Sequence, residues 1–282
     1  MTTLDQFLDR ITDLPPAPRV APRLLTLLAQ PDIDGAHVVE LIQCDPALTA
    51  SVMRLCNSVM LGGATSVDSL PEAVLRLGFG QTYELVLAIL AASTLSRAQK
   101  GYGLERGELW QHSLAAALCA KSMARDRGED PHVVFTAALL HDLGKIVLAQ
   151  ALEGQYNQLM DQVQVHQFSM LEAEVKLLGV QHAEVGARLL ARWSFPEHLV
   201  AAVCHHHDPA QAPLQPLLAA QVSLADMVAH FMGFGYGYES FALRGRAEAL
   251  DLAGLTPQDL PRYMIQTYEQ LETLRLLLRL QP

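Results

Sequence analysis

The stretch AALLHDLGKIVLAQAL, residues 137–152, carries polar side chains in a run that is otherwise mostly Ala, Leu, Ile and Val. His141, Asp142 and Lys145 are costly to bury without partners, although the segment has the composition of a buried helix. Adjacent helical residues point about 100° apart, so His141 and Asp142 can reach one centre only at a helix end or bend. Gly144 would leave room there for a second backbone or a ligand. Lys145 lies one turn after His141, where its ammonium could hold a phosphate.

Further histidines and an aspartate sit in similar apolar, helix-like contexts after residue 110: His112, His182, His205, His206, His207 and Asp226. A single such histidine is more often a hydrogen-bonded core residue than a metal ligand. The group is different, because neutral imidazole and carboxylate together suit divalent transition metals such as Zn, Mn, Fe or Ni. Other histidines are predicted to be ordinary, mostly surface positions, namely His37, His132, His166, His198 and His230.

The elements that must position these groups are helices. Apolar residues recur at helical spacing nearly everywhere, and runs of alternating β-branched residues are absent. SLPEAVLRLG has Ser69 and Glu72 in capping-box spacing, and SFPEHLVAAVCHHHDP is predicted to repeat the device with Ser194. We therefore expect an all-α fold with roughly a dozen or more helices.

Two polar, glycine-containing stretches divide the chain. Residues 95–110 read as a junction, which predicts an N-terminal helical half over 1–98 and a second half over 99–232 that carries the histidines and aspartates. The remaining residues, 233–282, are expected to pack on this module. Their Gly- and Tyr-rich start (233–246) is predicted to be a connector, with a lid or interaction surface as the alternative. The apolar end of the last helix closes the core or, if exposed, forms a dimer contact.

Composition limits the classes of function. Half of the 282 residues are hydrophobic, 18% are charged and the net charge is −10, as expected of a folded protein that binds neither DNA nor anionic membranes directly. The four cysteines lack CxxC spacing and are predicted to be small buried hydrophobes in a reducing compartment; they are Cys44, Cys56, Cys119 and Cys204. Neither a signal peptide nor an uninterrupted apolar run of about 18 residues is apparent, so a cytoplasmic location is expected.

The motif LLHDLGK, with an upstream histidine and a downstream aspartate, resembles the HD superfamily of metal-dependent phosphohydrolases. Four residues fall in order on its H…HD…D pattern: His112, His141, Asp142 and Asp226. His182 with Gly186, and the pair His206–His207 before Asp208, resemble additional ligands of HD-GYP proteins. Glu108 matches a ligand position of some trinuclear relatives. The resemblance implies one or two divalent ions of Fe, Mn, Zn or Ni, held by His112, His141, Asp142, His182, His206, His207 and Asp226. The Gly-Tyr-Pro motif is absent after the histidine pair, so cyclic di-GMP hydrolysis is not implied.

The N-terminal half resembles the HDOD module, the HD-related output domain of bacterial signalling proteins. The matching pieces are LPPAP, LIQCDPALTASVMRLCNS and SLPEAVLRLGFGQ, and the resemblance runs from about Leu14 to Asp226. It implies a multi-helix HD-domain-like bundle with an N-terminal helical subdomain. It also implies a regulatory module that binds a signalling protein, a sensor or receiver domain, or a small ligand such as a nucleotide or phosphate.

Three functions therefore stay open at this point. The first is a non-catalytic output module with a possible metal site. The second is a metal-dependent phosphodiesterase in which Asp142 and Lys145 would be catalytic, since a metal can activate water for attack on phosphorus. The third is a purely structural metal site. The candidate donors do not fit this type well, because they are nitrogen and oxygen atoms, whereas structural zinc sites are rich in cysteine.

Overall fold

The computed structural model describes residues 20–28, 32–60, 67–165, 168–234 and 246–278, together with Leu4, Leu8 and Gln30. Within these ranges the regular elements are helices, and the only β pairing is an isolated bridge between Gln99 and Leu104. The predicted all-α fold is confirmed. The α-helices are α2 Val20–Leu28, α3 Gly35–Gln43, α4 Pro46–Met60, α5 Leu70–Leu77, α6 Phe79–Leu95, α7 Glu108–Arg127, α8 Pro131–Leu140, α9 Leu143–Ala151, α10 Tyr156–Gln164, α11 Met170–Leu178, α12 His182–Arg192, α13 Glu197–Cys204, α14 Pro216–Ala229, α15 Arg246–Ala253 and α16 Leu260–Leu278. Short 3₁₀ or π segments are η1 Lys100–Tyr102, η2 Pro209–Gln211, η3 His230–Phe234 and η5 Pro257–Asp259.

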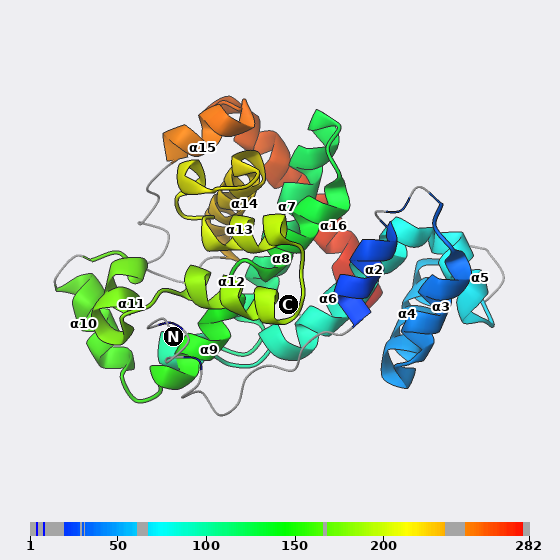
Figure 1. The fold of residues 1–282 in the computed structure, drawn as a ribbon, viewed down its shortest axis with the longest axis horizontal. Helices are drawn as coiled ribbons and strands as arrows, with labels where there is room; N and C mark the ends of the chain where they lie inside the picture. The colour runs from blue at the N-terminus through cyan, green and yellow to red at the C-terminus, as the bar shows by residue number, and fades with distance from the viewer. Residues whose placement is uncertain are drawn as a thin grey trace.

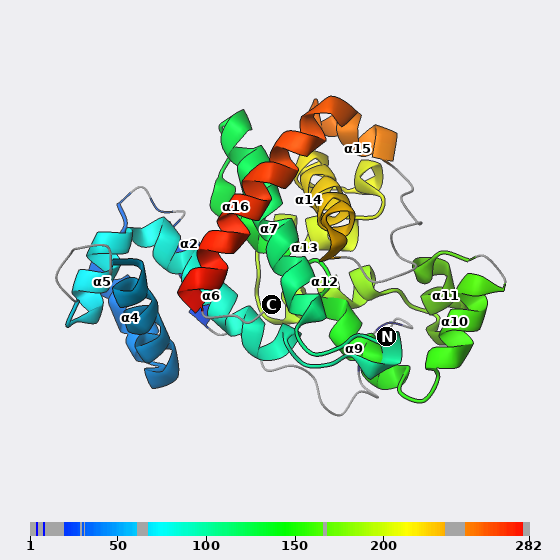
Figure 2. The same ribbon diagram turned by 180° about the vertical axis from the view of Figure 1, so that it is seen from behind.

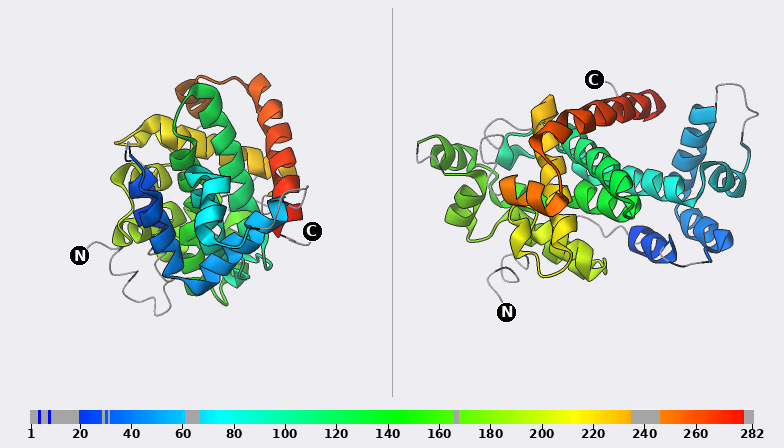
Figure 3. Two further views of the ribbon diagram at one scale, coloured as in Figure 1. Left: turned by 90° about the vertical axis from the view of Figure 1, so that its right-hand side faces the viewer. Right: turned by 90° about the horizontal axis from the view of Figure 1, so that it is seen from above.

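The helices form an elongated molecule. Helices α2 to α5 gather at one end, and the pair α10–α11 lies at the opposite end (Figures 1 and 3). Between the two ends, α7 packs against α8 and α14, and α12 packs against α9 and α13. Helix α16 runs along the outside of α7 (Figure 2). The buried core is continuous along this length, which fixes the relative positions of helices far apart in the sequence.

Helix α6 contacts α2, α4 and α5 of the N-terminal group and also α7 and α8 of the central bundle. Its contact with the bundle includes buried polar groups as well as core residues. Glu84 accepts a hydrogen bond from Lys121 of α7, and its other oxygen lies 3.0 Å from Nδ1 of His132 of α8. One residue earlier, the Tyr83 hydroxyl lies 2.7 Å from the hydroxyl of Thr136. We call these five residues the α6–α8 polar seam. A pocket of 260 Å³ opens beside it, between α6, α7 and α16.

Two helical stretches are long and apolar enough to cross a membrane by length and composition, and the bent pair α5–α6 would make a third if it were one span. Inside the protein, however, 89% of the window in Pro131–Ala151 and 56% of that in Pro216–Phe234 are buried. These stretches include α8, α9 and α14, which pack in the central bundle. The apolar side chains of these helices therefore contribute to the buried core of the protein.

Local predictions had mixed outcomes. Ser69 caps α5 as predicted, since its hydroxyl accepts a hydrogen bond from the Glu72 backbone at 3.4 Å. The prediction for Ser194 is wrong: this residue has φ 63°, and α13 starts three residues later, after Pro196. All four cysteines are free thiols; Cys56 and Cys119 are buried as predicted, whereas Cys204 is partly buried and Cys44 is exposed. The Gly- and Tyr-rich stretch lies mostly outside the described residues, as does the apolar end of the chain beyond residue 278.

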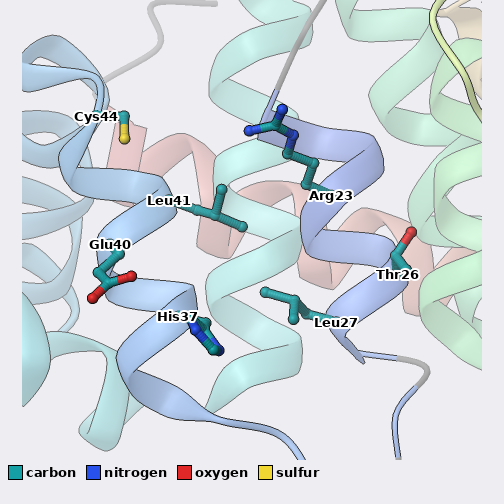
Figure 4. A pocket seen from close by; sticks show the side chains of 7 residues that line it. All are labelled: Arg23, Thr26, Leu27, His37, Glu40, Leu41 and Cys44. Atoms are coloured by element: carbon teal, nitrogen blue, oxygen red, sulfur yellow. The ribbon is translucent and has the colours of Figure 1, made fainter.

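Cys44 borders an apolar pocket of 490 Å³ between α2 and α3. Figure 4 shows Leu27 of α2 and Leu41 of α3 in this space, with Arg23 and His37 at its margins. The pocket lies in the N-terminal group of helices, away from the histidines and aspartates predicted to form a site.

Candidate metal centre

The apolar run 137–152 is not one helix. Helix α8 ends at Leu140 and α9 begins at Leu143, so His141 and Asp142 occupy the break between them. This is the bend that two adjacent ligands require. Gly144 explains the tightness of the break, because a Cβ at this position would lie 1.9 Å from the carbonyl oxygen of His182. The start of α12 is thereby brought against the start of α9.

The break lies among the other predicted ligands. His112 comes from α7, His182 is the first residue of α12, His206 and His207 follow α13, and Asp226 lies in α14. Three groups have donor atoms within 4.8 Å of one another, namely His112–His141–Asp226, His141–Asp142–His206 and His182–His206–His207. The structure therefore brings all seven predicted ligands together, and the three groups share members.

Four of the imidazoles are oriented by an acceptor for Nδ1. His141 and His206 have Nδ1 at 2.7 Å from the main-chain oxygens of Ala138 and Val203, three residues earlier in each case. His112 has Nδ1 at 3.0 Å from the oxygen of Phe234, and His182 has Nδ1 at 2.9 Å from a Glu174 carboxylate oxygen. In the neutral form that keeps the proton on Nδ1, Nε2 presents a lone pair, as a metal ligand must; binding of a cation would displace any proton from Nε2.

The Nε2 atoms point at the carboxylates and at each other. His112 Nε2 lies 3.0 Å from Asp226 Oδ1, and His182 Nε2 lies 3.3 Å from Asp142 Oδ1. The Nε2 atoms of His141 and His206 are buried and make no hydrogen bond within the described part of the chain. Buried polar atoms without a hydrogen bond need another partner, and a divalent cation is a partner that imidazole nitrogens and carboxylate oxygens can bind.

Asp142 lies at the middle of the centre. Its Oδ1 faces His182, while its Oδ2 lies 3.4 Å from Nε2 of His141 and accepts a hydrogen bond from Lys145 Nζ at 2.8 Å. Its two oxygens thus face both ends of the histidine cluster. Lys145 is 2% exposed and holds Asp142, which places its ammonium at the centre.

Burial and neighbouring charges lower the pKa of one buried histidine of the centre and raise the pKa values of two others. Burial lowers the pKa of His206, and His141 adds to this effect, giving a value of about 3. For His141, burial is outweighed by the Asp142 carboxylate and other acceptors, which raise its pKa to about 10. For His182, the Glu174 carboxylate is the main group that outweighs burial, and the pKa is about 9. The pKa of Asp142 lies well below its usual range, because the nearby cations outweigh burial.

Two residues near the centre were not predicted as part of it. Glu174 is fully buried on α11 and binds His182 and Tyr102. His230, predicted as a surface position, has a side chain that is 4% exposed, with Nδ1 at 3.1 Å from Asp226 Oδ1. Its place four residues after Asp226 on one helix was the available sequence signal. Glu108, which matched a ligand position of trinuclear relatives, is exposed and lies outside the centre, where its carboxylate accepts a hydrogen bond from the backbone of Glu105.

Comparison with known proteins identifies the family of the chain. The HDOD domain family model matches residues 14–209. The chain belongs to the HDOD domain family. A solved structure of an HDOD domain protein of unknown function from Geobacter sulfurreducens matches with a TM-score of 0.72 and 25% identity, covering 94% of this chain and 96% of that one.

Two curated relatives extend the comparison of this HDOD protein. An uncharacterized protein of Treponema pallidum is 27% identical over 235 residues, which cover 82% of this chain and 45% of the relative. Ribonuclease Y of Thermus thermophilus is 32% identical over 116 residues, which cover 41% of this chain and 15% of the relative. The HDOD chain therefore spans less than half the length of either relative.

Proposed function

We propose that this HDOD protein is a bacterial signal-transduction output module that carries a divalent metal centre. The observation that carries the metal centre is the set of anchored imidazoles: four Nδ1 atoms meet an acceptor, and the Nε2 atoms converge with Asp142 and Asp226. A purely hydrogen-bonded core would satisfy these buried nitrogens, whereas those of His141 and His206 make no hydrogen bond within the described residues.

The donor set indicates which ions would bind. Imidazole nitrogens with carboxylate oxygens favour Mn, Fe, Zn or Ni over Mg or Ca. His112, His141 and Asp226 would hold one ion, and His182, His206 and His207 a second. Asp142 lies between these groups, with one oxygen toward each of His141 and His182. The proposal therefore includes two ions with Asp142 shared by both.

Two features favour a regulatory role over hydrolysis: the chain belongs to the HDOD family, and the side chains of most of the proposed ligands are buried away from solvent. His112, His141 and His206 are 0% exposed, and His182 and Asp142 are 1% exposed. Lys145, the residue expected to hold a phosphate, instead donates to Asp142. As an output module in the cytoplasm, the protein would act on a signalling partner, such as a separate sensor or receiver domain, or respond to a nucleotide or phosphate ligand.

A metal-dependent phosphodiesterase is the second candidate, favoured by the likeness to ribonuclease Y over 116 residues. Divalent ions in this centre would supply Lewis-acid activation of water and of a phosphodiester. In that function, Asp142 would hold the ions and Lys145 would orient Asp142 or contact a phosphate oxygen after rearrangement. Asp142 and Lys145 are thus the residues to test for catalysis.

Metal analysis separates these possibilities. We expect protein purified without chelator and supplied with Mn, Fe, Zn or Ni to retain one or two ions per chain, and Asp142→Ala to lose them. Asp251→Ala, which removes an exposed carboxylate on α15, is the matched control and should bind normally. Wild-type protein that stays free of metal would refute the metal centre. Hydrolysis of bis-nitrophenyl phosphate by the loaded wild type, abolished in Asp142→Ala, would replace the regulatory proposal with the enzyme.

A further inference from the structure

Glu174 is a buried carboxylate at the junction of the α10–α11 pair with the body of the protein. It is 0% exposed, and its oxygens accept hydrogen bonds from the Tyr102 hydroxyl at 2.7 Å and the backbone of His182 at 2.8 Å. Nδ1 of His182 lies 2.9 Å from the same carboxylate. A buried carboxylate needs several donors to offset its lost hydration, and Glu174 has three.

These contacts set His182 apart from the other anchored imidazoles. His141 and His206 are held by the main chain three residues earlier, so their orientation follows from local backbone geometry. His182 is held by a side chain from another helix. Its Nε2 lies 3.3 Å from Asp142 Oδ1 and 2.9 Å from Nε2 of His207.

Helix α11 is also attached by apolar contacts. Of its nine residues, Met170, Ala173 and Glu174 are buried, and the partly buried Leu177 and Leu178 pack against the core. Its partner α10 buries Leu159 and Met160 and contacts η1, the segment that contributes Tyr102. The pair projects at the end of the molecule opposite α2 to α5 (Figure 3). Glu174 therefore joins a projecting pair of helices directly to a candidate metal ligand.

We propose that Glu174 is a positioning residue that couples the α10–α11 pair to the metal centre. This inference rests on the metal centre proposed above. An ion on His182 requires the ring orientation that Glu174 imposes, so metal binding stabilises the docked position of α11. Because such coupling is reciprocal, displacement of α11 weakens metal binding at His182 by the same factor. Occupancy of a buried centre is thereby transmitted to a surface that a partner can reach.

The test combines zinc affinity with hydrogen exchange on the full chain. In the wild type, Zn²⁺ should slow amide exchange in peptides from α10 and α11 as well as in those from α8 and α9. In Glu174→Gln, zinc affinity should fall roughly 10- to 100-fold, as for other groups that orient metal-bound histidines. At saturating zinc, the slowing should persist in α8 and α9 and be lost in α10 and α11.

Two further variants keep the result interpretable. Tyr102→Phe removes one donor to Glu174 without changing a proposed ligand, and should weaken zinc binding in the same direction by a smaller factor. Glu172→Gln on the same helix should leave zinc binding unchanged, because Gln can also complete its capping box with Ser169.

The outcomes distinguish the two proposals. Wild-type protein without any zinc binding would overturn the metal centre and the coupling together. Normal zinc binding in the wild type, with unchanged affinity in both Glu174→Gln and Tyr102→Phe, would overturn the coupling alone. So would zinc that slows exchange in α8 and α9 of the wild type but not in α10 and α11.

Discussion

The buried ion pair of the α6–α8 polar seam gives a quantitative test of how the N-terminal helices are held on the bundle. Glu84 and Lys121 are each 8% exposed, and Lys121 also lies 6.0 Å from the centre of the Phe135 ring. Removing one member of a buried pair leaves an uncompensated charge and typically costs about 3–5 kcal/mol. The neighbouring 260 Å³ pocket can admit water, so we expect the lower end, about 3 kcal/mol, for Glu84→Gln.

Lys121→Met should lower the free energy of unfolding by less, about 2 kcal/mol, because His132 Nδ1 remains 3.0 Å from the Glu84 carboxylate and can still partly compensate its negative charge. The double variant should lose less than the sum of the single losses, with a coupling energy of about 2 kcal/mol. Urea unfolding followed by circular dichroism measures all three values. The control is Glu72→Gln, which breaks the partly exposed pair with Arg76 and should cost at most about 0.5 kcal/mol. Additive losses in the double variant would show that the pair does not stabilise the seam.

The same pair predicts a pH dependence with a defined sign. Although burial opposes it, His132 and Lys121 lower the pKa of Glu84 below its ordinary value of 4.5. A carboxyl group with a lowered pKa in the folded state contributes stability that is complete above its unfolded pKa and is lost as the pH falls through the folded pKa. The wild type should therefore lose stability below about pH 4.5 more steeply than Glu84→Gln. Equal slopes would contradict the assignment.

Two other predictions concern the centre. Gly144→Ala would place a Cβ 1.9 Å from the His182 carbonyl, so we expect a loss of about 3 kcal/mol in the free energy of unfolding together with weaker metal binding. Gly128→Ala, which has φ +70° but open space around its Cβ position, should cost only about 1 kcal/mol and leave metal binding intact. Addition of Zn²⁺ at a hundred times its Kd should stabilise the fold by about 2.7 kcal/mol, seen as a rise in Tm that a chelator reverses. A Tm unchanged by zinc would contradict a metal centre formed only in the folded state.

The helical class could be predicted because apolar spacing and caps are local signals. Ser69, for example, caps α5 where its spacing from Glu72 indicated. Ser194 resembles Ser69 in sequence but adopts φ 63°, since the chain turns there before Pro196, and capping spacing alone does not show such a turn. Local sequence patterns thus predicted where helices form better than they predicted the turns that connect the helices.

The proposed ligands could be picked out because polar groups in apolar helices are unusual and each occurrence is visible in the sequence. Their orienting partners are different. Glu174 has the same appearance in sequence as the partly exposed Glu172 two residues earlier, and only the packing of α11 on its neighbours buries it. His230 was placed on the surface although it follows Asp226 by four residues, because this spacing alone does not show that α14 continues into η3 and keeps the His230 ring against Asp226.

The main-chain anchoring of His141 and His206 has a consequence for how such a centre changes over evolutionary time. Each ring is set by a main-chain carbonyl three residues earlier, in the last turn of the preceding helix, so its direction depends on backbone geometry and hardly on the identity of nearby side chains. Substitutions around the centre can accumulate without turning these rings away. Loss of Glu174 or Lys145 should instead disturb the orientation of His182 or Asp142, because these two groups are held by side chains.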